Sequence, residues 1–248
     1  MLLVGDIGNT ETKICLINSK KKIVRKIIFS SKNITRKQLI GKIKILKLKS
    51  KNIKKCLFCS VVPNTYKIIK IYLKKFYNIK SFELKDLKLE NLIKIKVNKR
   101  QIGSDRLANA ISVIDNKNNY IIVDFGTATN FDVVINNQYI GGILAPGLEL
   151  SLNNLIEKAS LIPKIDIAKT KNVIGKNTKS AIRSGFYHGY SGLIDNIIKL
   201  IIKQTKKSYK IILTGGLAHL FKNSIKGKVL INKDLTINGI LKVAIKSK

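Results

Sequence analysis

Two short segments of this chain contain residues that suit a phosphate-binding turn. In each, an apolar stretch ends at an aspartate, a glycine follows two residues later, and hydroxyl or amide side chains come next; the segments are Asp6–Thr12 and Asp124–Thr129. The glycine lets backbone N–H groups approach a phosphate oxygen, because no Cβ is in the way. The hydroxyl and amide groups add donors. The two patterns therefore predict two turns that bind a polyphosphate.

The two segments match each other at a constant offset of 118 residues. The matched pairs are Asp6 with Asp124, Gly8 with Gly126, and Asn18 with Asn136. We interpret the match as an internal duplication of a strand–turn–strand unit, with a chance resemblance of two hairpins as the alternative. Each copy would open one domain, which predicts an N-terminal domain over 1–117 and a C-terminal domain over 118–248.

A third segment, Gly103–Arg106, stands where apolar spacing predicts the start of a helix, with Ser104 as a candidate N-cap. Asp105 could accept the proton of an attacking hydroxyl, and Arg106 could hold an acidic group of a substrate. Phosphoryl transfer needs chiefly positioning, charge neutralisation and one carboxylate that orients the nucleophile. The alternative is that Asp105 only stabilises the helix N-terminus, where a negative charge is favourable. Spacing alone leaves both interpretations open.

Apolar periodicity predicts the elements that carry these segments. Apolar runs between turn residues predict strands, and a spacing of three to four residues predicts helices. We expect strands at 2–4, 14–18, 57–62, 120–124, 131–135 and 210–214, and helices at 66–76, 105–114 and 193–202. Together they indicate an α/β fold.

Other candidate sites in the sequence are weaker. Cys56 and Cys59 have the spacing of a redox or zinc pair, but residues three apart on a strand face opposite sides, so both are interpreted as packed core thiols. His188 and His219 have no acidic or cysteine partner nearby in sequence and are interpreted as ordinary polar residues. The Gly141–Gly147 loop predicts a close backbone approach. The sequence has neither a Walker P-loop nor a dinucleotide-binding glycine motif.

The net charge of +34 first suggests nucleic acid as a partner. However, only five of the 48 basic residues are arginine, aromatic residues make up 6%, and the lysines are spread along the whole chain. Nucleic-acid readers usually combine arginine with aromatic stacking, so we interpret the lysine content as compositional drift and expect no specific nucleic acid. A basic nucleic-acid-binding regulator is kept as the alternative outside the enzymes.

The sequence also predicts where the protein works. It has no apolar stretch of about 18 residues, so we expect no membrane span. The first residues do not have the pattern of a signal peptide, because no basic region precedes the early apolar run and Asp6 interrupts that run. We therefore expect a cytoplasmic location.

Taken together, the motifs resemble those of the type III pantothenate kinases, in the same order and over nearly the whole chain. The matching pieces are 6–10, 60–63, 103–106, 124–129, 141–147, 175–178 and 214–216. Each piece alone is weak, and the set is specific. The resemblance implies a fold of the acetate and sugar kinase / actin superfamily, that is, an actin-like ATPase fold with two ribonuclease-H-like domains related by duplication.

The resemblance also implies an activity and a set of site residues. The family transfers the γ-phosphate of ATP to pantothenate, and the product, 4′-phosphopantothenate, begins coenzyme A synthesis. Asp105 would be the catalytic base, and pantothenate would contact Gly103, Ser104, Asp105, Arg106 and Thr178. ATP, accompanied by Mg²⁺, would contact Asp6, Ile7, Gly8, Asn9, Thr10, Glu11, Thr12, Lys13 and Thr127. Asp124 would lie at the monovalent cation site, K⁺ or NH₄⁺, and the chain would form a homodimer whose substrate pocket is completed at the subunit interface.

Three positions depart from the family pattern. Asn130 stands where the family often has Thr, Lys99 where it commonly has Pro, and Ser104 where it commonly has Ala. The loop at Lys99 is expected to be less rigid for lack of the proline. None of the three changes removes a charged group, so we expect activity to be retained. A kinase of the same superfamily that acts on another small alcohol is the alternative among the enzymes.

Overall fold

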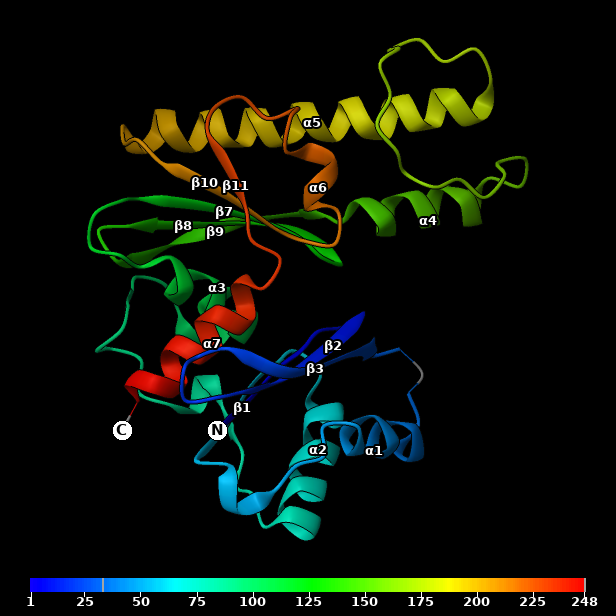
Figure 1. Ribbon diagram of the computed structural model, residues 1–248. Helices are drawn as coiled ribbons and strands as arrows, with labels where there is room; N and C mark the ends of the chain where they lie inside the picture. Colours follow the sequence, from blue (N-terminus) through cyan, green and yellow to red (C-terminus); the bar gives the residue numbers. More distant parts are fainter. Residues whose placement is uncertain (33, 248) are drawn as a thin grey trace. The chain divides into compact units, whose positions relative to one another are not determined.

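The computed structural model, which describes residues 1–32 and 34–247, has two β-sheets, and the chain divides into two compact units (Figure 1). The first unit holds Met1–Asp115, Asn137–Tyr139 and the segment that starts at Asp234. The second holds Asn116–Asn136 and Ile140–Lys233. The mixed α/β architecture agrees with the fold class expected from the sequence, whereas the domain bounds at 117 and 118 stay a prediction.

The sheet of the first unit has the strand order β3-β2-β1-β4-β5. Its strands are β1 (Leu2–Ile7), β2 (Glu11–Ile17), β3 (Ile23–Ser30), β4 (Lys55–Ser60) and β5 (Phe82–Glu83). β2 runs antiparallel to both of its neighbours, β1 and β3, while β4 runs parallel to β1 and β5 parallel to β4. The ends of β1 and β4 therefore lie side by side at one edge of the sheet.

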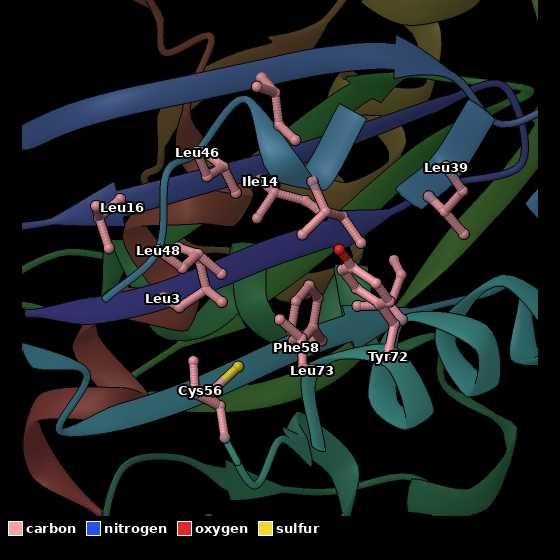
Figure 2. Packing of buried hydrophobic residues seen from close by; sticks show 14 of the residues in the cluster. Leu3, Ile14, Leu16, Leu39, Leu46, Leu48, Cys56, Phe58, Tyr72 and Leu73 are labelled. Atoms are coloured by element: carbon pink, nitrogen blue, oxygen red, sulfur yellow. The ribbon is translucent and has the colours of Figure 1, made fainter. Parts of the chain in front are cut away.

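Helices cover both faces of this sheet (Figure 1). On one face, α1 (Arg36–Lys44) and α2 (Pro63–Tyr77) enclose an apolar core with alternate strand residues, among them Leu3, Ile14 and Phe58 (Figure 2). On the other face, α3 (Ser104–Val113) and α7 (Leu235–Lys246) pack against β1 and β4. A Cβ on Gly239 of α7 would lie 1.8 Å from the carbonyl oxygen of Ala108 in α3, so these two helices approach closely only because that position is glycine.

The second unit is built on the strand order β11-β10-β7-β8-β9. Its strands are β7 (Tyr120–Phe125), β8 (Ala128–Ile135), β9 (Gln138–Pro146), β10 (Lys210–Gly215) and β11 (Val229–Ile231). β7 pairs antiparallel with β8 and parallel with β10. Three helices bury an apolar face against one side of the sheet: α4 (Leu148–Lys158), α5 (Thr178–Thr205) and α6 (Ala218–Phe221).

Short elements complete the chain. The two-residue strand β6 (Lys94–Ile95) pairs with Gln138 and Tyr139 at the start of β9, and all four residues belong to the first unit. Three 3₁₀ turns are η1 (Ser50–Asn52), η2 (Leu84–Asp86) and η3 (Lys99–Gln101). None of the helices in residues 1–32 and 34–247 is apolar over a long enough stretch to cross a lipid bilayer.

All nine elements predicted from periodicity are present, with ends shifted by up to fifteen residues at α5. The strands that flank the first turn extend further than predicted, to Ile7 and from Glu11, so only the three residues 8–10 separate them. The predicted N-cap of α3 was wrong: the cap is Gly103, and Ser104 is the first helical residue. The reason is that the Ser104 hydroxyl is engaged elsewhere, as described below.

Candidate active site

The first predicted turn joins β1 to β2 and exposes polar groups at its tip. Gly8 N donates a hydrogen bond to Glu11 O at 3.0 Å, which closes the turn. Asn9, Thr10 and Glu11 are exposed. Their backbone and side-chain groups are accessible, as a phosphate-binding turn requires.

Two residues of this segment lie beneath the turn rather than at its tip. Thr12 is fully buried, and its hydroxyl is 2.7 Å from the hydroxyl of Ser31. Ile7 is also fully buried, and its carbonyl oxygen accepts a hydrogen bond from Val61 N at 3.0 Å. Ile7 and Thr12 therefore fix the shape of the turn from below.

Asp6 is the residue before the last in the first strand and lies next to Cys59 of β4 in the parallel register. The Cys59 thiol donates a hydrogen bond to Asp6 Oδ1 at 3.4 Å. Burial, followed by the negative charge of Asp105, raises the pKa of Asp6 from its ordinary value of 3.8 to about 6, while the thiol and Lys13 act against this rise. Asp6 therefore titrates close to the physiological range.

Helix α3 begins at the third predicted segment and presents Asp105 in its first turn. A Cβ on the N-cap residue Gly103 would lie 2.2 Å from Asp105 Oδ1, so the glycine leaves room for this carboxylate. The buried Ser104 hydroxyl accepts a hydrogen bond from Ser60 N at 2.9 Å and donates one to Ser60 O at 3.2 Å. This pair of bonds ties the start of α3 to the end of β4.

The Asp105 carboxylate has features of both roles that the sequence left open, a stabiliser of the helix N-terminus and a catalytic base. Its Oδ1 accepts a hydrogen bond from Arg106 N at 2.8 Å, which stabilises the free N–H groups of the helix start. Burial nevertheless raises the pKa of Asp105, against the opposing effects of Arg106 and Lys85. A carboxylate that is more basic than usual is better suited to accept a proton from an alcohol.

Asp6 and Asp105 lie within electrostatic reach of each other in the first unit. The charge of Asp105 contributes to the raised pKa of Asp6, second only to burial. Two carboxylates that lie near each other with limited access to water are more typical of functional sites than of sites that only stabilise the fold. The structure therefore brings together the first and third segments predicted from the sequence.

The loop before α3 is anchored in the absence of the proline that the family commonly has. Lys85 Nζ donates hydrogen bonds to the carbonyl oxygens of Arg100 at 3.1 Å and Ile102 at 2.7 Å. Asn98 Oδ1 accepts from Arg100 N at 3.0 Å, and Lys99 Nζ donates to Leu87 O at 3.3 Å. These bonds restrain a loop that the sequence predicted to be less rigid.

The second predicted turn, between β7 and β8 in the second unit, is tightly enclosed by backbone. Gly126 N donates to Ala128 O at 3.1 Å, and Thr127 is exposed at the tip. A Cβ on Gly147 would lie 2.1 Å from Thr127 O, and one on Gly215 would lie 2.4 Å from Phe125 O. Gly147 ends the predicted glycine loop, so the expected close backbone approach is confirmed.

Oxygen atoms gather on one face of the second sheet beside Asp124. Asn130 is the cross-strand partner of Asp124 in β8, and Thr214 is its partner in β10, so the three side chains share a face. Asn130 Oδ1 is buried and has no hydrogen-bond partner among the residues that the structure describes. Within the same residues, no three His, Cys, Asp or Glu side chains form a metal-binding cluster. One carboxylate with neutral oxygens fits a weakly held, hard cation such as K⁺.

Thr178, the remaining predicted residue, is the first residue of α5 and is exposed. Asn177 caps this helix, since its side chain accepts from Ser180 N at 2.9 Å. A Cβ on Gly175 would lie 2.2 Å from Ala181 N, so the preceding loop packs directly on the first helical turn. The segment 175–178 is thus a well-defined helix start in the second unit.

Cys59 and Ser60 contact the predicted site, and Lys85 contacts the loop directly before it, although sequence reasoning gave these residues no role. Cys56 and Cys59 are free and buried, which confirms their prediction as packed thiols, and Cys15 is free and buried as well. That prediction was incomplete for Cys59, which also bonds to Asp6. The sequence did contain a signal for this contact. Cys59 stands directly before Ser60, near the end of a strand that was expected to be buried in the sheet.

Comparison with known proteins agrees with these features. The family model described as type III pantothenate kinase matches residues 2–200. A type III pantothenate kinase from Pelagibacter ubique is 61% identical over 242 residues, covering 98% of this chain and 98% of that protein. Another from Desulforapulum autotrophicum is 33% identical over 255 residues, covering 98% and 96%.

Solved structures show the same fold at low sequence identity. A 2-dehydro-3-deoxygalactonokinase candidate from Sinorhizobium meliloti superposes with a TM-score of 0.60 at 9% identity, covering 98% of each chain. An N-acetylglucosamine kinase candidate from Porphyromonas gingivalis gives 0.53 at 14% identity, covering 99% of each. The fold is therefore that of the actin-like ATPases and sugar kinases. On the match of sequence and family model, the chain belongs to the type III pantothenate kinases, which use ATP to phosphorylate pantothenate in the first step of coenzyme A biosynthesis.

Proposed function

We propose that Asp105 is the catalytic base of this kinase and that Asp6 and its turn bind the phosphates of ATP. One observation carries this assignment: at the end of β4, Cys59 bonds to Asp6 and the next residue, Ser60, bonds to Ser104 beside Asp105, so both carboxylates lie at one strand end. Asp105 accepts the proton of the pantothenate hydroxyl as this oxygen attacks the γ-phosphorus of ATP, and ADP leaves. The protein contributes mainly position and charge to this step.

The exposed tip of the first turn suits the phosphates of ATP. Gly8 to Glu11 offer backbone donors, with the side chains of Asn9 and Thr10 beside them. Lys13 follows on β2 opposite Asp6 and supplies a positive charge. Ile7 and Thr12 contribute by holding the backbone of the turn. We assign Thr127, at the tip of the second turn, to ATP as well.

Pantothenate carries a carboxylate that a guanidinium can hold. Arg106 is half-buried, and its guanidinium lies 6.0 Å from the ring centroid of Tyr139. Gly103, Ser104 and Asp105 precede it at the helix start, and we assign the four residues to the pantothenate site. Thr178, exposed at the first turn of α5, is assigned to the same substrate.

Asp124, with Asn130 and Thr214 on the same face, would hold a monovalent cation, K⁺ or NH₄⁺. Such a cation supplies fixed positive charge near transferring phosphates, and Mg²⁺ would accompany ATP. The unpartnered oxygen of Asn130 supports this assignment, because a buried amide oxygen without a donor is costly unless a cation or another donor is bound. We further propose a homodimer, as the family resemblance suggests, and, from the composition and pattern of the sequence, a cytoplasmic location with no specific nucleic-acid or membrane partner.

The cation assignment predicts a change in K⁺ dependence when Asp124 is replaced. We expect ADP release that requires pantothenate and K⁺ or NH₄⁺, with Na⁺ a poor substitute. Asp124→Asn should raise the half-saturating K⁺ concentration at least about tenfold, because a charged oxygen ligand is lost. A coupled assay of ADP release at varied K⁺ measures this shift.

The control is Asp166→Asn, which changes an exposed aspartate of the same unit and should leave the K⁺ dependence as it is. Equal K⁺ dependence in Asp124→Asn and in the unaltered protein would contradict the cation site. Absence of pantothenate-dependent ADP release from the unaltered protein would contradict the proposed reaction.

A further inference from the structure

The thiol of Cys59 lies directly beneath the Asp6 carboxylate. Its Sγ is 3.4 Å from Asp6 Oδ1, and the residue is 0% exposed. Asp6 and Cys59 are partners in the parallel pairing of β1 with β4, so both side chains project from the same face of the sheet. The contact is therefore set by strand register and not by a mobile side chain at the surface.

Toward Asp6, Cys59 acts as the hydrogen-bond donor. Burial raises the pKa of its thiol well above the ordinary value, and the charges of Asp6 and Asp105 raise it further. The thiol thus keeps its proton, and an ionised Asp6 can only accept. The same burial argues against a redox role, since reactive thiols are exposed and acidic, and Cys59 is free.

The charged neighbours of the Asp6 carboxylate do not fix its orientation, because some repel it and one attracts it. A hydrogen-bond donor such as the Cys59 thiol is therefore needed to orient it. Asp105 on α3 and Glu11 on β2 repel it, while Lys13 on β2 attracts it. A single donor fixed in the sheet limits how far the carboxylate can turn away from Asp105. The next residue of β4, Ser60, holds the start of α3 through its two bonds to Ser104.

We propose that Cys59 is a positioning residue for phosphoryl transfer: its S–H orients the Asp6 carboxylate, while the adjacent Ser60 anchors the helix that carries Asp105. The end of β4 thus sets the spacing of the two carboxylates. This inference rests on the proposed function, because it acts through Asp6.

Three substitutions at Cys59 and one at Cys56 test the proposal by steady-state kinetics. Cys59→Ala and the better-filling Cys59→Val remove the donor and should lower kcat about tenfold, with KM for pantothenate within about twofold. Cys59→Ser keeps a donor and should stay within about threefold of the original kcat. Cys56→Ala removes a buried thiol of the same strand that packs in the apolar core (Figure 2), and should leave kcat unchanged.

The outcomes separate this proposal from the proposed function when Asp6→Asn is measured alongside. Original kcat in Cys59→Val, or equal losses in Cys59→Val and Cys59→Ser, would overturn the positioning role even if Asp6→Asn is inactive. Full activity of Asp6→Asn would overturn both assignments. If Cys59→Ala fails to fold, Cys59→Val against Cys59→Ser decides the question alone.

Discussion

Asp105→Asn should lower kcat for pantothenate phosphorylation by about a thousandfold while the protein stays folded, because removal of a general base commonly costs two to four orders of magnitude. The asparagine retains the size of the side chain and can still accept the hydrogen bond from Arg106 N, which measures 2.8 Å in the original protein. It cannot accept a proton from an alcohol. KM for ATP should change little, since the turn at Gly8 to Glu11 is untouched. Steady-state ADP release and circular dichroism measure activity and folding.

The matched control is Asp86→Asn, which alters an exposed aspartate of the same unit. It should keep the original kcat. An Asp105→Asn protein with undiminished turnover would show that Asp105 serves only the helix N-terminus, the structural role that the sequence left open.

Asp6→Asn should abolish most activity, by about a hundredfold or more, and make the protein more stable above pH 6. The folded-state pKa of Asp6 is raised from 3.8 to about 6, so the folded state holds this proton more tightly than the unfolded chain. The free energy of unfolding therefore falls as pH rises from about 4 to about 6, by as much as about 3 kcal/mol. The asparagine carries no charge and avoids this loss.

Urea unfolding at pH 4 and pH 8 measures the effect. Asp6→Asn should exceed the original protein in free energy of unfolding at pH 8, and the difference should shrink toward pH 4. Asp86→Asn should show no such pH-dependent gain. A variant that is active, or is less stable at both pH values, would contradict the assignment of Asp6 as a strained functional carboxylate.

The sequence predicted those parts of the site that depend on local backbone requirements. A glycine two residues after an aspartate at a strand end is a local signal, and both turns are present at Gly8 and Gly126. The start of α3 at Gly103–Asp105 was likewise predicted, because apolar spacing defined the helix. Its cap was misassigned, since a serine near a helix start favours the N-cap unless tertiary contacts engage its hydroxyl, as Ser60 does here.

The constant offset between the two hairpins describes only part of the structure. Lys13 lies opposite Asp6, whereas Asn130 lies opposite Asp124, so the second turn is one residue shorter than the offset of 118 requires. Side chains alternate between the two faces of a sheet, so a shift of one residue changes the face. After the turn, each residue of the second hairpin therefore lies on the opposite face from the residue 118 positions earlier. An ungapped comparison therefore places the aspartates correctly but not the residues that follow the turn.

Contacts that depend on long-range packing could not be predicted from local patterns. The bond from Cys59 to Asp6 requires the register of two strands that are separated by more than forty residues. The placement of α7 in the first unit requires Gly239 to fit against Ala108, and an isolated glycine in an apolar helix gives no hint of its partner. The sequence thus predicted the segments that carry the candidate site. It did not identify the residues, such as Cys59 and Gly239, that hold those segments in position.

The coupling of Asp6 and Asp105 can be measured directly by a pH titration of carboxyl carbons with ¹³C NMR, comparing the original protein with Asp105→Asn. The Asp6 carboxyl should titrate at about pH 6 in the original protein. Its midpoint should fall in Asp105→Asn, because a neighbouring negative charge is removed. An Asp6 midpoint near 3.8 in the original protein, or one that does not move in the variant, would contradict a shared site for the two carboxylates.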